Sequence, residues 1–320
     1  MITECKVCSN LQGNELFVIK EMQLGLREAF TYQLCGSCGC MQLQDIPHNL
    51  SAYYPNKDYY SFTTQLNIRS SPDLLRKIRS SYLIHGKNKI IGSILSAGYK
   101  MPGYMEWMKI PQIQFDDSIL DVGTGNGSLL LDLYKNGFTN LNGIDPFIDK
   151  DAVYNSINIL KKDIFQVHGS YDYIMLNHVF EHMDEPWKVL EKLYQLLNPG
   201  KYLLIRTPVM GNYGWLKYKE NWMPADAPRH IIIHSEKSIR LLAEKAGFKI
   251  KQVVYDGDPF TFIASEQYEK DIPLLDKRSY FVNKKDSIFS ENEIKKLKQL
   301  VKKLNADGQG DQAAFYLYKS

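Results

Sequence analysis

The chain has 320 residues, 39 of them basic and 36 acidic, which allows a large core with one or two smaller modules. This near-neutral balance argues against a nucleic-acid partner, because surfaces that follow phosphates carry a marked basic excess. No apolar run has the length of a membrane span and the N-terminus lacks a signal-peptide pattern, so we expect a soluble cytoplasmic protein.

Cysteine pairs mark the N-terminal region. Four of the five cysteines form two pairs of two-residue spacing: Cys5, Cys8, Cys35 and Cys38. Residues 15–22 and 28–34 alternate apolar and polar side chains, which predicts a hairpin that brings the pairs together. Four thiolates suit one tetrahedral structural zinc ion, whereas a redox dithiol and plain buried cysteines are the alternatives.

The predicted zinc ribbon covers residues 1–48. So short a module buries too little core to fold alone, and metal binding would supply much of its stability. Cys40 is left over; it could replace Cys38 as a ligand, but the two-residue spacing favours Cys38.

Residues 49–112 are expected to form an aromatic linker and a helical cap. Pro55 indicates an irregular segment, and Tyr59 and Tyr60 are candidates for a lid over a substrate. From residue 74 to 95, apolar residues recur at helical spacing, which predicts two helices broken near Gly86 that cover one side of a sheet.

A glycine-rich loop follows the apolar strand at residues 119–122, with glycines at positions 123, 125 and 127. Such a loop lets backbone N–H groups approach a ligand at the start of the next helix. The spacing differs from the dinucleotide fingerprint, and no Gly-Lys-Ser/Thr follows as in a phosphate-binding loop. Asp121, two residues before the first glycine, suits a cationic group and would repel a pyrophosphate.

Further elements are predicted along the rest of the chain. They are a core-packed helix over 186–197, a helix between Ser235 and Gly247, a strand over 248–255, a helix from Glu291 with a Ser290/Glu293 capping box, and a strand over 312–318.

These motifs, in this order, resemble the class I S-adenosylmethionine (SAM)-dependent methyltransferases. The resemblance implies an α/β, Rossmann-like sheet of seven strands with the last strand antiparallel, spanning residues 113–320 and preceded by the small zinc ribbon. It also implies that Asp145 binds the ribose hydroxyls, that Asp163 and Ile164 flank the adenine, and that SAM is the cofactor. The predicted SAM-binding residues are Asp121, Gly123, Thr124, Gly125, Asn126, Gly127, Asp145, Pro146, Asp163, Ile164 and Asn177.

Methyl transfer requires alignment of the acceptor with the sulfonium and a base for the acceptor proton. By the same resemblance, strands end at Asp145, Asp163 and His178, and a further strand follows the turn at Pro199 and Gly200. The predicted catalytic residues lie at the ends of the last two of these strands and beyond them: His178, Glu181, His182 and His230. One interpretation makes His178 or His230 the general base. A second is a divalent metal site built from all four, similar to that of the plant small-RNA 3′-end methyltransferases and the quinone O-methyltransferases, although His178 replaces an acid there. A third is that Glu181 and His182 only cap and orient the next segment.

The acceptor is predicted from resemblance alone. The ribbon, the SAM core, residues 226–230 and residues 310–316 resemble bacterial methyltransferases of surface-polysaccharide and deoxysugar biosynthesis. We therefore expect methylation of a hydroxyl on a sugar or nucleotide-sugar, a small-molecule partner. The alternatives are C-methylation of a nucleotide-linked ketosugar, RNA methylation with the ribbon binding nucleic acid, and a non-catalytic scaffold. The sequence does not indicate an oligomeric state.

Overall fold

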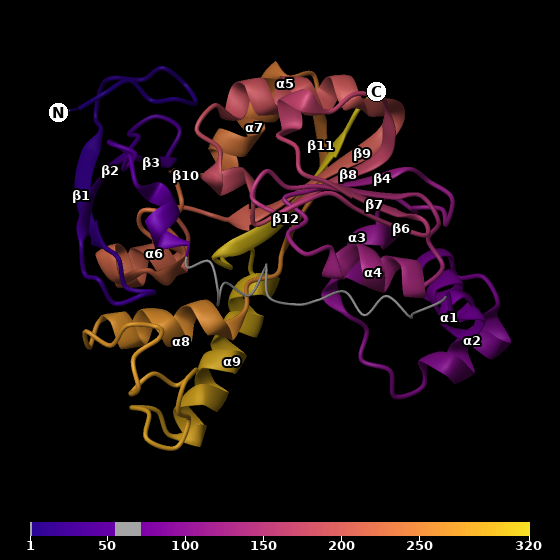
Figure 1. The fold of residues 1–320 in the computed structure, drawn as a ribbon. Coiled ribbons are helices and arrows are strands. Elements are labelled where there is room, and N and C mark those ends of the chain that lie inside the picture. Colours follow the sequence, from indigo (N-terminus) through magenta and orange to yellow (C-terminus); the bar gives the residue numbers. More distant parts are fainter. Residues whose placement is uncertain (1, 55–71) are drawn as a thin grey trace.

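The computed structural model describes residues 2–54 and 72–320 of the chain. These residues form a large mixed sheet covered by helices, a small N-terminal sheet, and a group of C-terminal helices beside the small sheet (Figure 1). The predicted irregular segment at Pro55 and the predicted lid residues Tyr59 and Tyr60 lie outside the described residues. Among the residues that are described, no helix combines the length and hydrophobicity of a bilayer-spanning segment.

The large sheet is mixed, as the resemblance implies, but it contains eight described strands rather than seven. In spatial order they are β11 (Lys249–Tyr255), β12 (Gln312–Tyr318), β9 (Leu197–Pro208), β8 (Tyr171–Asn177), β4 (Ile119–Val122), β5 (Leu141–Ile144), β7 (Ile157–Leu160) and β6 (Ala152–Tyr154). As predicted, β12 runs antiparallel between β11 and β9. The additional strand is β6, which is only three residues long and pairs antiparallel with β7 at the edge. So short a segment has too few residues to show the alternation that marks a strand.

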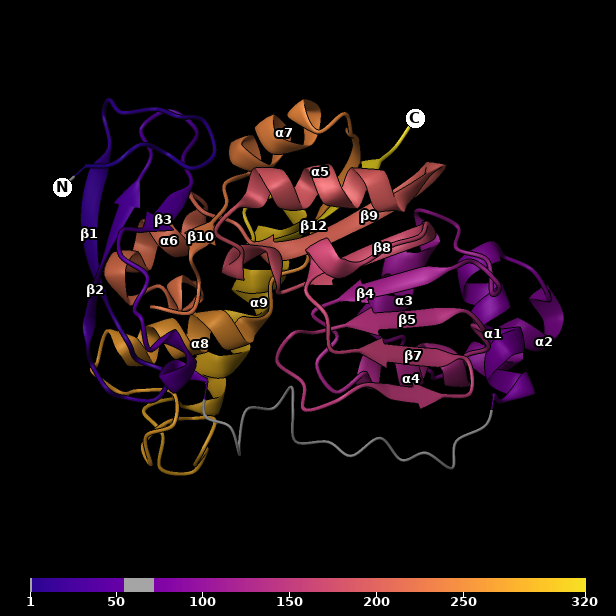
Figure 2. The ribbon, with the colours of Figure 1, turned by 45° about the horizontal axis from the view of Figure 1, so that its top comes forward.

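Helices cover both faces of this sheet (Figure 2). The helices α5 (Pro186–Leu196) and α7 (Glu236–Lys245) pack on one face, where the fully buried Leu190 and Leu193 of α5 meet the strands. The helices α3 (Gly103–Lys109) and α4 (Ser128–Lys135) pack on the other face. Ser235 caps α7 by accepting the backbone N–H of Ser238 at 3.0 Å, as its position predicts.

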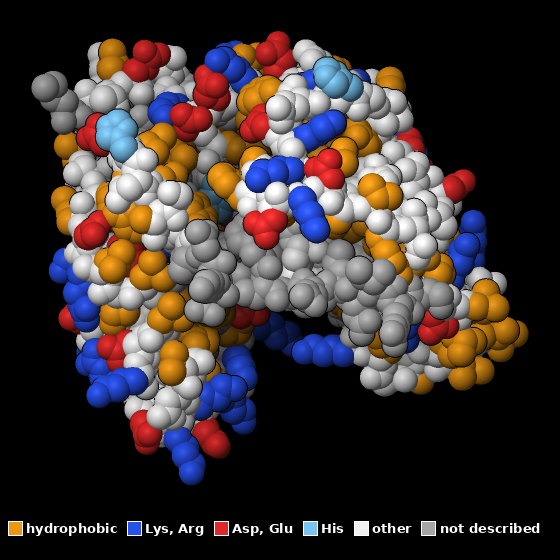
Figure 3. All heavy atoms as spheres, in the orientation of Figure 1, with side chains coloured by type: hydrophobic (Ala, Val, Ile, Leu, Met, Phe, Trp, Pro, Cys, Tyr) orange, Lys and Arg blue, Asp and Glu red, His pale blue; other side chains and the backbone are white. Residues whose placement is uncertain are grey.

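The two predicted helices of the cap are present as α1 (Leu74–His85) and α2 (Lys89–Ser96). Gly86 separates them in a left-handed conformation with φ 66°. They cover the sheet only in part. Ile84 near the end of α1 is 4% exposed and belongs to the buried cluster on the face of α3 and α4. Leu74, Ile90 and Ile94 are instead 70%, 79% and 68% exposed, and hydrophobic side chains gather on this lobe in Figure 3. Helical periodicity identifies an apolar face, but it does not specify what that face contacts.

The small sheet consists of three N-terminal strands and one strand from the middle of the chain. The N-terminal strands are β1 (Glu15–Lys20), β2 (Ala29–Leu34) and β3 (Met41–Leu43). β1 and β2 form the predicted antiparallel hairpin. The fourth strand, β10 (Ile232–Ile233), pairs with β3 and was not predicted.

Three helices of the second half of the chain adjoin the small sheet. They are α6 (Tyr213–Tyr218), α8 (Pro259–Tyr268) and α9 (Glu291–Ala306), the last with the predicted capping box. Trp222, Phe262 and Leu304 share a buried cluster with Tyr32 of β2. Short 3-10 helices complete the described elements: η1 (Leu50–Tyr53), η2 (Ile164–Gln166), η3 (Phe180–His182), η4 (Lys219–Asn221) and η5 (Met223–Ala225).

Candidate active site

The glycine loop joins the central strand β4 to helix α4. Gly123, Gly125 and Gly127 have φ angles of 72°, 54° and 75°, a backbone region that favours glycine. A Cβ atom added at Gly123 would lie only 2.4 Å from a methyl carbon of Val179. The loop therefore requires glycine at this position, and its backbone N–H groups lie at the carboxyl edge of the sheet, where ligands of open α/β sheets bind.

Two buried carboxylates lie at the ends of the neighbouring strands β4 and β5. Asp121 is 4% exposed, and burial raises its pKa to about 7. Burial also raises the pKa of Asp145, whose two oxygens accept the backbone N–H groups of Gly125 at 3.0 Å and Phe147 at 2.8 Å. These acids suit a ligand that carries a cation and hydroxyl groups, because such a ligand would compensate their lost hydration.

The remaining predicted cofactor residues of the glycine loop and β5 lie nearby. Thr124 is buried beside Asp121, and its side chain offsets part of the effect of burial on the pKa of that carboxyl. The Asn126 side chain accepts the backbone N–H of Ser128 at 3.0 Å and so holds the start of α4. Pro146, next to Asp145, is exposed.

Asp163, Ile164 and Asn177 follow β7 and β8. Asp163 is exposed and caps η2 by accepting the backbone N–H of Phe165 at 2.9 Å, whereas Ile164 is 3% exposed in the core. Asn177 ends β8, and its Oδ1 accepts a hydrogen bond from Arg206 at 3.0 Å. Because β8, β4, β5 and β7 are consecutive in the sheet, all predicted cofactor residues share one edge.

His178 is held between a cation and a carboxylate. It lies just after β8 with φ 55°; its Nε2 is 2.8 Å from Arg206 Nη1, and its Nδ1 is 3.2 Å from Glu181 Oε1. A guanidinium only donates hydrogen bonds, so Nε2 accepts and Nδ1 carries the proton. Both ring nitrogens of His178 are therefore engaged by the protein.

Glu181 is fully buried at the centre of the histidine cluster. Burial raises its pKa, but the hydrogen bond from His178 and the nearby imidazoles outweigh this effect and hold the pKa below its usual range. Its other oxygen accepts a hydrogen bond from the Thr207 hydroxyl at 2.9 Å. Glu181 is therefore an ionised, oriented carboxylate.

His230 has the opposite arrangement from His178. Its Nδ1 donates to the carbonyl of Pro224 at 2.7 Å, which leaves the lone pair on Nε2. This Nε2 lies 3.9 Å from Glu181 Oε1 and 3.8 Å from Asp226 Oδ2. Burial lowers the pKa of His230 to about 4, so the ring is neutral at physiological pH.

His182 lies against His230 with 4.8 Å between ring centroids, and its Nδ1 donates to the carbonyl of Arg229 at 2.8 Å. Donor atoms of Glu181, His182 and His230 lie within 4.8 Å of one another, a donor set that suits a divalent cation. His178, the fourth residue of the predicted metal site, is not part of this set.

The four predicted zinc ligands, Cys5, Cys8, Cys35 and Cys38, lie within 4.8 Å of one another. The Sγ atoms of Cys5 and Cys38, and of Cys8 and Cys35, are each 3.6 Å apart. A tetrahedral ZnS₄ centre with Zn–S bonds of about 2.3 Å has edges of about 3.8 Å, whereas a disulfide bond is about 2.05 Å long. The geometry therefore fits a tetrahedral thiolate site.

The fifth cysteine also lies in this cluster. The Sγ of Cys40 is 3.4 Å from that of Cys38 and 3.5 Å from that of Cys5. Cys40 is fully buried, but the group of four cysteines whose sulfur atoms lie within 4.8 Å of one another contains Cys38 and not Cys40, in line with the two-residue spacing.

Four polar residues of the site were not singled out from the sequence: Glu21, Tyr32, Arg206 and Thr207. Asp226 and Arg229 lie in the segment 226–230 that carries part of the resemblance, but the sequence assigned them no role. The only local signal for Arg206 is a charge within the apolar run of β9. The others come together through contacts between distant parts of the chain.

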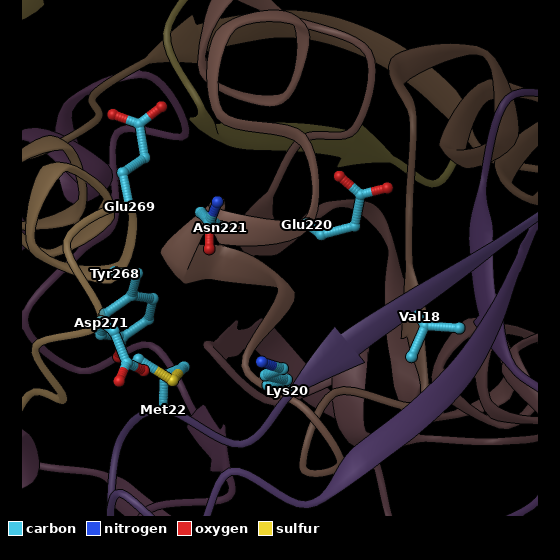
Figure 4. Close-up of a pocket in the computed structure, with 8 residues that line it drawn as sticks. All are labelled: Val18, Lys20, Met22, Glu220, Asn221, Tyr268, Glu269 and Asp271. Atoms are coloured by element: carbon cyan, nitrogen blue, oxygen red, sulfur yellow. The ribbon is translucent and has the colours of Figure 1, made fainter.

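A pocket of about 200 Å³ lies away from this edge, between β1 and α8 (Figure 4). Lys20, Glu269 and Asp271 are among the residues around it. None of the residues that line this described pocket is a predicted site residue, so we do not assign the reaction to it.

The comparisons with known proteins identify the family. A family model described as a methyltransferase domain matches residues 86–253, just over half of the 320 residues. The EEF1A lysine methyltransferase 2 proteins of Mus musculus and Homo sapiens are 40% and 39% identical over 72 residues, or 22% of this chain. The match spans 29% and 30% of those proteins, so the chain covers less than a third of these relatives.

Among solved structures, the mycolic acid cyclopropane synthase CmaA1, in complex with SAH and CTAB, is 15% identical with a TM-score of 0.47. The superposition covers 85% of this chain and 99% of that one.

The family match includes the glycine loop, both edge carboxylates and the histidine cluster. The chain therefore belongs to the methyltransferase-domain family.

Proposed function

We propose that this methyltransferase transfers the methyl group of SAM to a hydroxyl of a sugar or nucleotide-sugar, with His230 as the general base. The observation that supports His230 as the base is the lone pair on its Nε2, which the Nδ1–H bond to the Pro224 carbonyl leaves free. His178 is the weaker candidate because Arg206 occupies its Nε2.

The cofactor is proposed to lie along the edge formed by β8, β4, β5 and β7. Asp121 would bind the ammonium group of SAM, and Asp145 would exchange its backbone partners for the ribose hydroxyls. The backbone around Asp163 and Ile164 would flank the adenine, and Asn177 would lie beside the reacting groups. Charge supports this arrangement, since an ammonium compensates a buried carboxylate.

The reaction then requires few groups. Bound SAM would supply the electrophilic methyl group and would leave as S-adenosylhomocysteine, its sulfur keeping the electron pair of the broken bond. His230 Nε2 would take the proton of the acceptor hydroxyl as that oxygen is methylated. Asp226 and Glu181 stabilise the imidazolium that forms, because their carboxylates lie 3.8 and 3.9 Å from Nε2. S-adenosylhomocysteine and the protonated base remain.

A second candidate acceptor is the amine of a protein lysine, which the match to the EEF1A lysine methyltransferases favours. The same imidazole would remove the proton from a lysine ammonium before attack. The sugar acceptor rests on the sequence resemblance described above, as does the alternative of C-methylation at a ketosugar.

We also propose that Cys5, Cys8, Cys35 and Cys38 hold a structural zinc ion in an N-terminal module. The sulfur distances of 3.6 Å and the near-complete burial of three of the four thiols support this assignment.

The acceptor class is tested with methyl-labelled SAM and a cell extract divided into acid-soluble and macromolecular fractions. Label in an acid-soluble, nucleotide-linked product supports the sugar acceptor. Protease-sensitive label in the macromolecular fraction supports lysine, and nuclease-sensitive label supports RNA.

The base is tested with His230→Gln and His178→Ala, with the exposed His48→Ala as the control. His230→Gln should lose turnover and keep SAM affinity, and His178→Ala should lose less. A metal role for Glu181, His182 and His230 predicts instead that added Mg²⁺ or Mn²⁺ stimulates the wild-type rate.

A further inference from the structure

The segment that carries His230 lies between the small N-terminal sheet and the large sheet. Within it, β10 pairs with β3 of the small sheet. The Ile231 carbonyl accepts the N–H of Leu43 at 2.8 Å, and the Ile231 N–H donates to the carbonyl of Glu181 at 2.8 Å. Ile231, the residue next to His230, is thus hydrogen-bonded both to β3 of the small sheet and to η3, which follows β8 of the large sheet.

Tyr32 of β2 contacts the backbone of the proposed base itself. Its side chain is 0% exposed, and its hydroxyl donates to the carbonyl of His230 at 2.9 Å. Loss of this hydroxyl would leave a buried carbonyl without that partner, which favours movement of the loop.

A buried ionic group makes a second connection. Arg229 is fully buried. Its guanidinium donates two hydrogen bonds to Asp226, at 2.6 and 2.9 Å, and one to Glu21 at 3.2 Å. Glu21 directly follows β1. Glu21 is itself fixed by the backbone N–H groups of residues 23, 24 and 26 at 2.8 to 3.0 Å. Arg229 in turn orients His182 through its carbonyl, and Asp226 faces His230 Nε2.

We infer that the N-terminal ribbon supplies two positioning residues for methyl transfer, Tyr32 and Glu21, which hold the loop of His230 in place. The inference rests on the proposed role of His230. Neither residue belongs to the SAM edge of β4, β5, β7 and β8, so their loss should lower the rate of transfer and leave SAM affinity unchanged.

The test compares Tyr32→Phe and Glu21→Gln with a matched control, Tyr173→Phe. Tyr173 of β8 is also 0% exposed, and its hydroxyl donates to the carbonyl of Trp107 in helix α3 at 3.0 Å. Initial rates are measured with labelled SAM and a fixed amount of the extract fraction that wild-type protein methylates. The KM and Kd for SAM and the Tm are measured for each variant.

Both ribbon variants should lose at least tenfold in rate at saturating SAM, with KM and Kd for SAM within twofold of wild type. A displacement of about 1 Å at a catalytic group is enough for such losses. Tyr173→Phe should lower the Tm as much as Tyr32→Phe and keep the wild-type rate. If Glu21→Gln does not fold, Tyr32→Phe decides, because it keeps the packed ring.

Wild-type rates in folded Tyr32→Phe, or an equal loss of rate in Tyr173→Phe, would overturn the inference. The proposed base is judged separately by His230→Gln. Full activity of His230→Gln refutes the proposed role of His230 as the base, whereas an inactive His230→Gln beside a fully active Tyr32→Phe refutes only the positioning role.

Discussion

SAM affinity should depend on pH through Asp121. This carboxylate is 4% exposed, and burial raises its pKa to about 7 in the free protein. The ammonium of SAM favours the ionised form, so binding below pH 7 requires that a proton leaves first. The proposed contact therefore makes affinity fall as the pH falls through the pKa of the free protein.

The magnitude follows from the single titration. With a pKa near 7, the Kd for SAM rises about tenfold for each pH unit below 7 and reaches roughly 100-fold at pH 5, or about 2.7 kcal/mol. Binding should release about one proton at pH 5.5 and roughly a quarter of a proton at pH 7.5.

Calorimetric titration of SAM from pH 5.0 to 7.5, in two buffers of different ionisation enthalpy, measures both the Kd and the proton count. Asp121→Asn should bind weakly and show no such slope, while the exposed Asp116→Asn behaves as wild type. The Tm of ligand-free Asp121→Asn at pH 7.5 should not fall below that of wild type. Burial of the ionised carboxylate destabilises the folded wild-type protein, and the neutral amide of Asn removes this cost. A Kd for wild-type protein that is constant over this range refutes the reasoning. A wild-type slope in Asp121→Asn would assign the titration to Asp145.

Three further outcomes are expected. His230→Gln should lower kcat by about 10² to 10⁴-fold at unchanged SAM affinity. Burial lowers the pKa of His230 to about 4, and the base must be neutral to accept a proton. The kcat of the wild-type protein should therefore fall only as the pH drops through about 4. Protein purified without chelator should contain about one zinc ion per chain, measured by atomic emission, and Cys5→Ser should contain much less and melt earlier. Gly123→Ala should lose SAM binding and several degrees of Tm, since its φ is 72° and a Cβ would lie 2.4 Å from a neighbouring valine; Gly103→Ala, with nothing within 4 Å of the added atom, should retain both.

The sequence predicted most of the large sheet because its signals are local. The glycine loop, the cap at Ser235 and the capping box at Ser290 each depend on residues a few positions apart, and the structure has them as expected. The predicted packing of the cap helices on the sheet was wrong for α2, because packing depends on tertiary contacts. The sequence of α2 shows an apolar face, but it does not specify that Ile90 on this face is 79% exposed.

The candidate site divides in the same way. The cofactor edge could be located from strand ends, since parallel strands place their carboxyl ends together. The hydrogen bonds that distinguish His230 from His178 could not be predicted, because Pro224 and Arg206 define the two tautomers only after the loops have folded. The contact of Glu21 with Arg229 spans 208 positions and leaves no local pattern.

The pairing of β10 with β3 also sets the order of events during synthesis. Ile232 lies opposite Gln42, 190 residues earlier in the chain. At about 5 to 20 residues per second, a ribosome takes roughly 10 to 40 s to make the intervening segment. The hairpin of β1 and β2 can form at once, but the neighbour that completes its sheet arrives only after most of the large sheet has been translated. The first three strands of the small sheet are therefore synthesised first, but the sheet is completed late. Until β10 pairs with it, the open edge of β3 can pair with another chain and so favours aggregation.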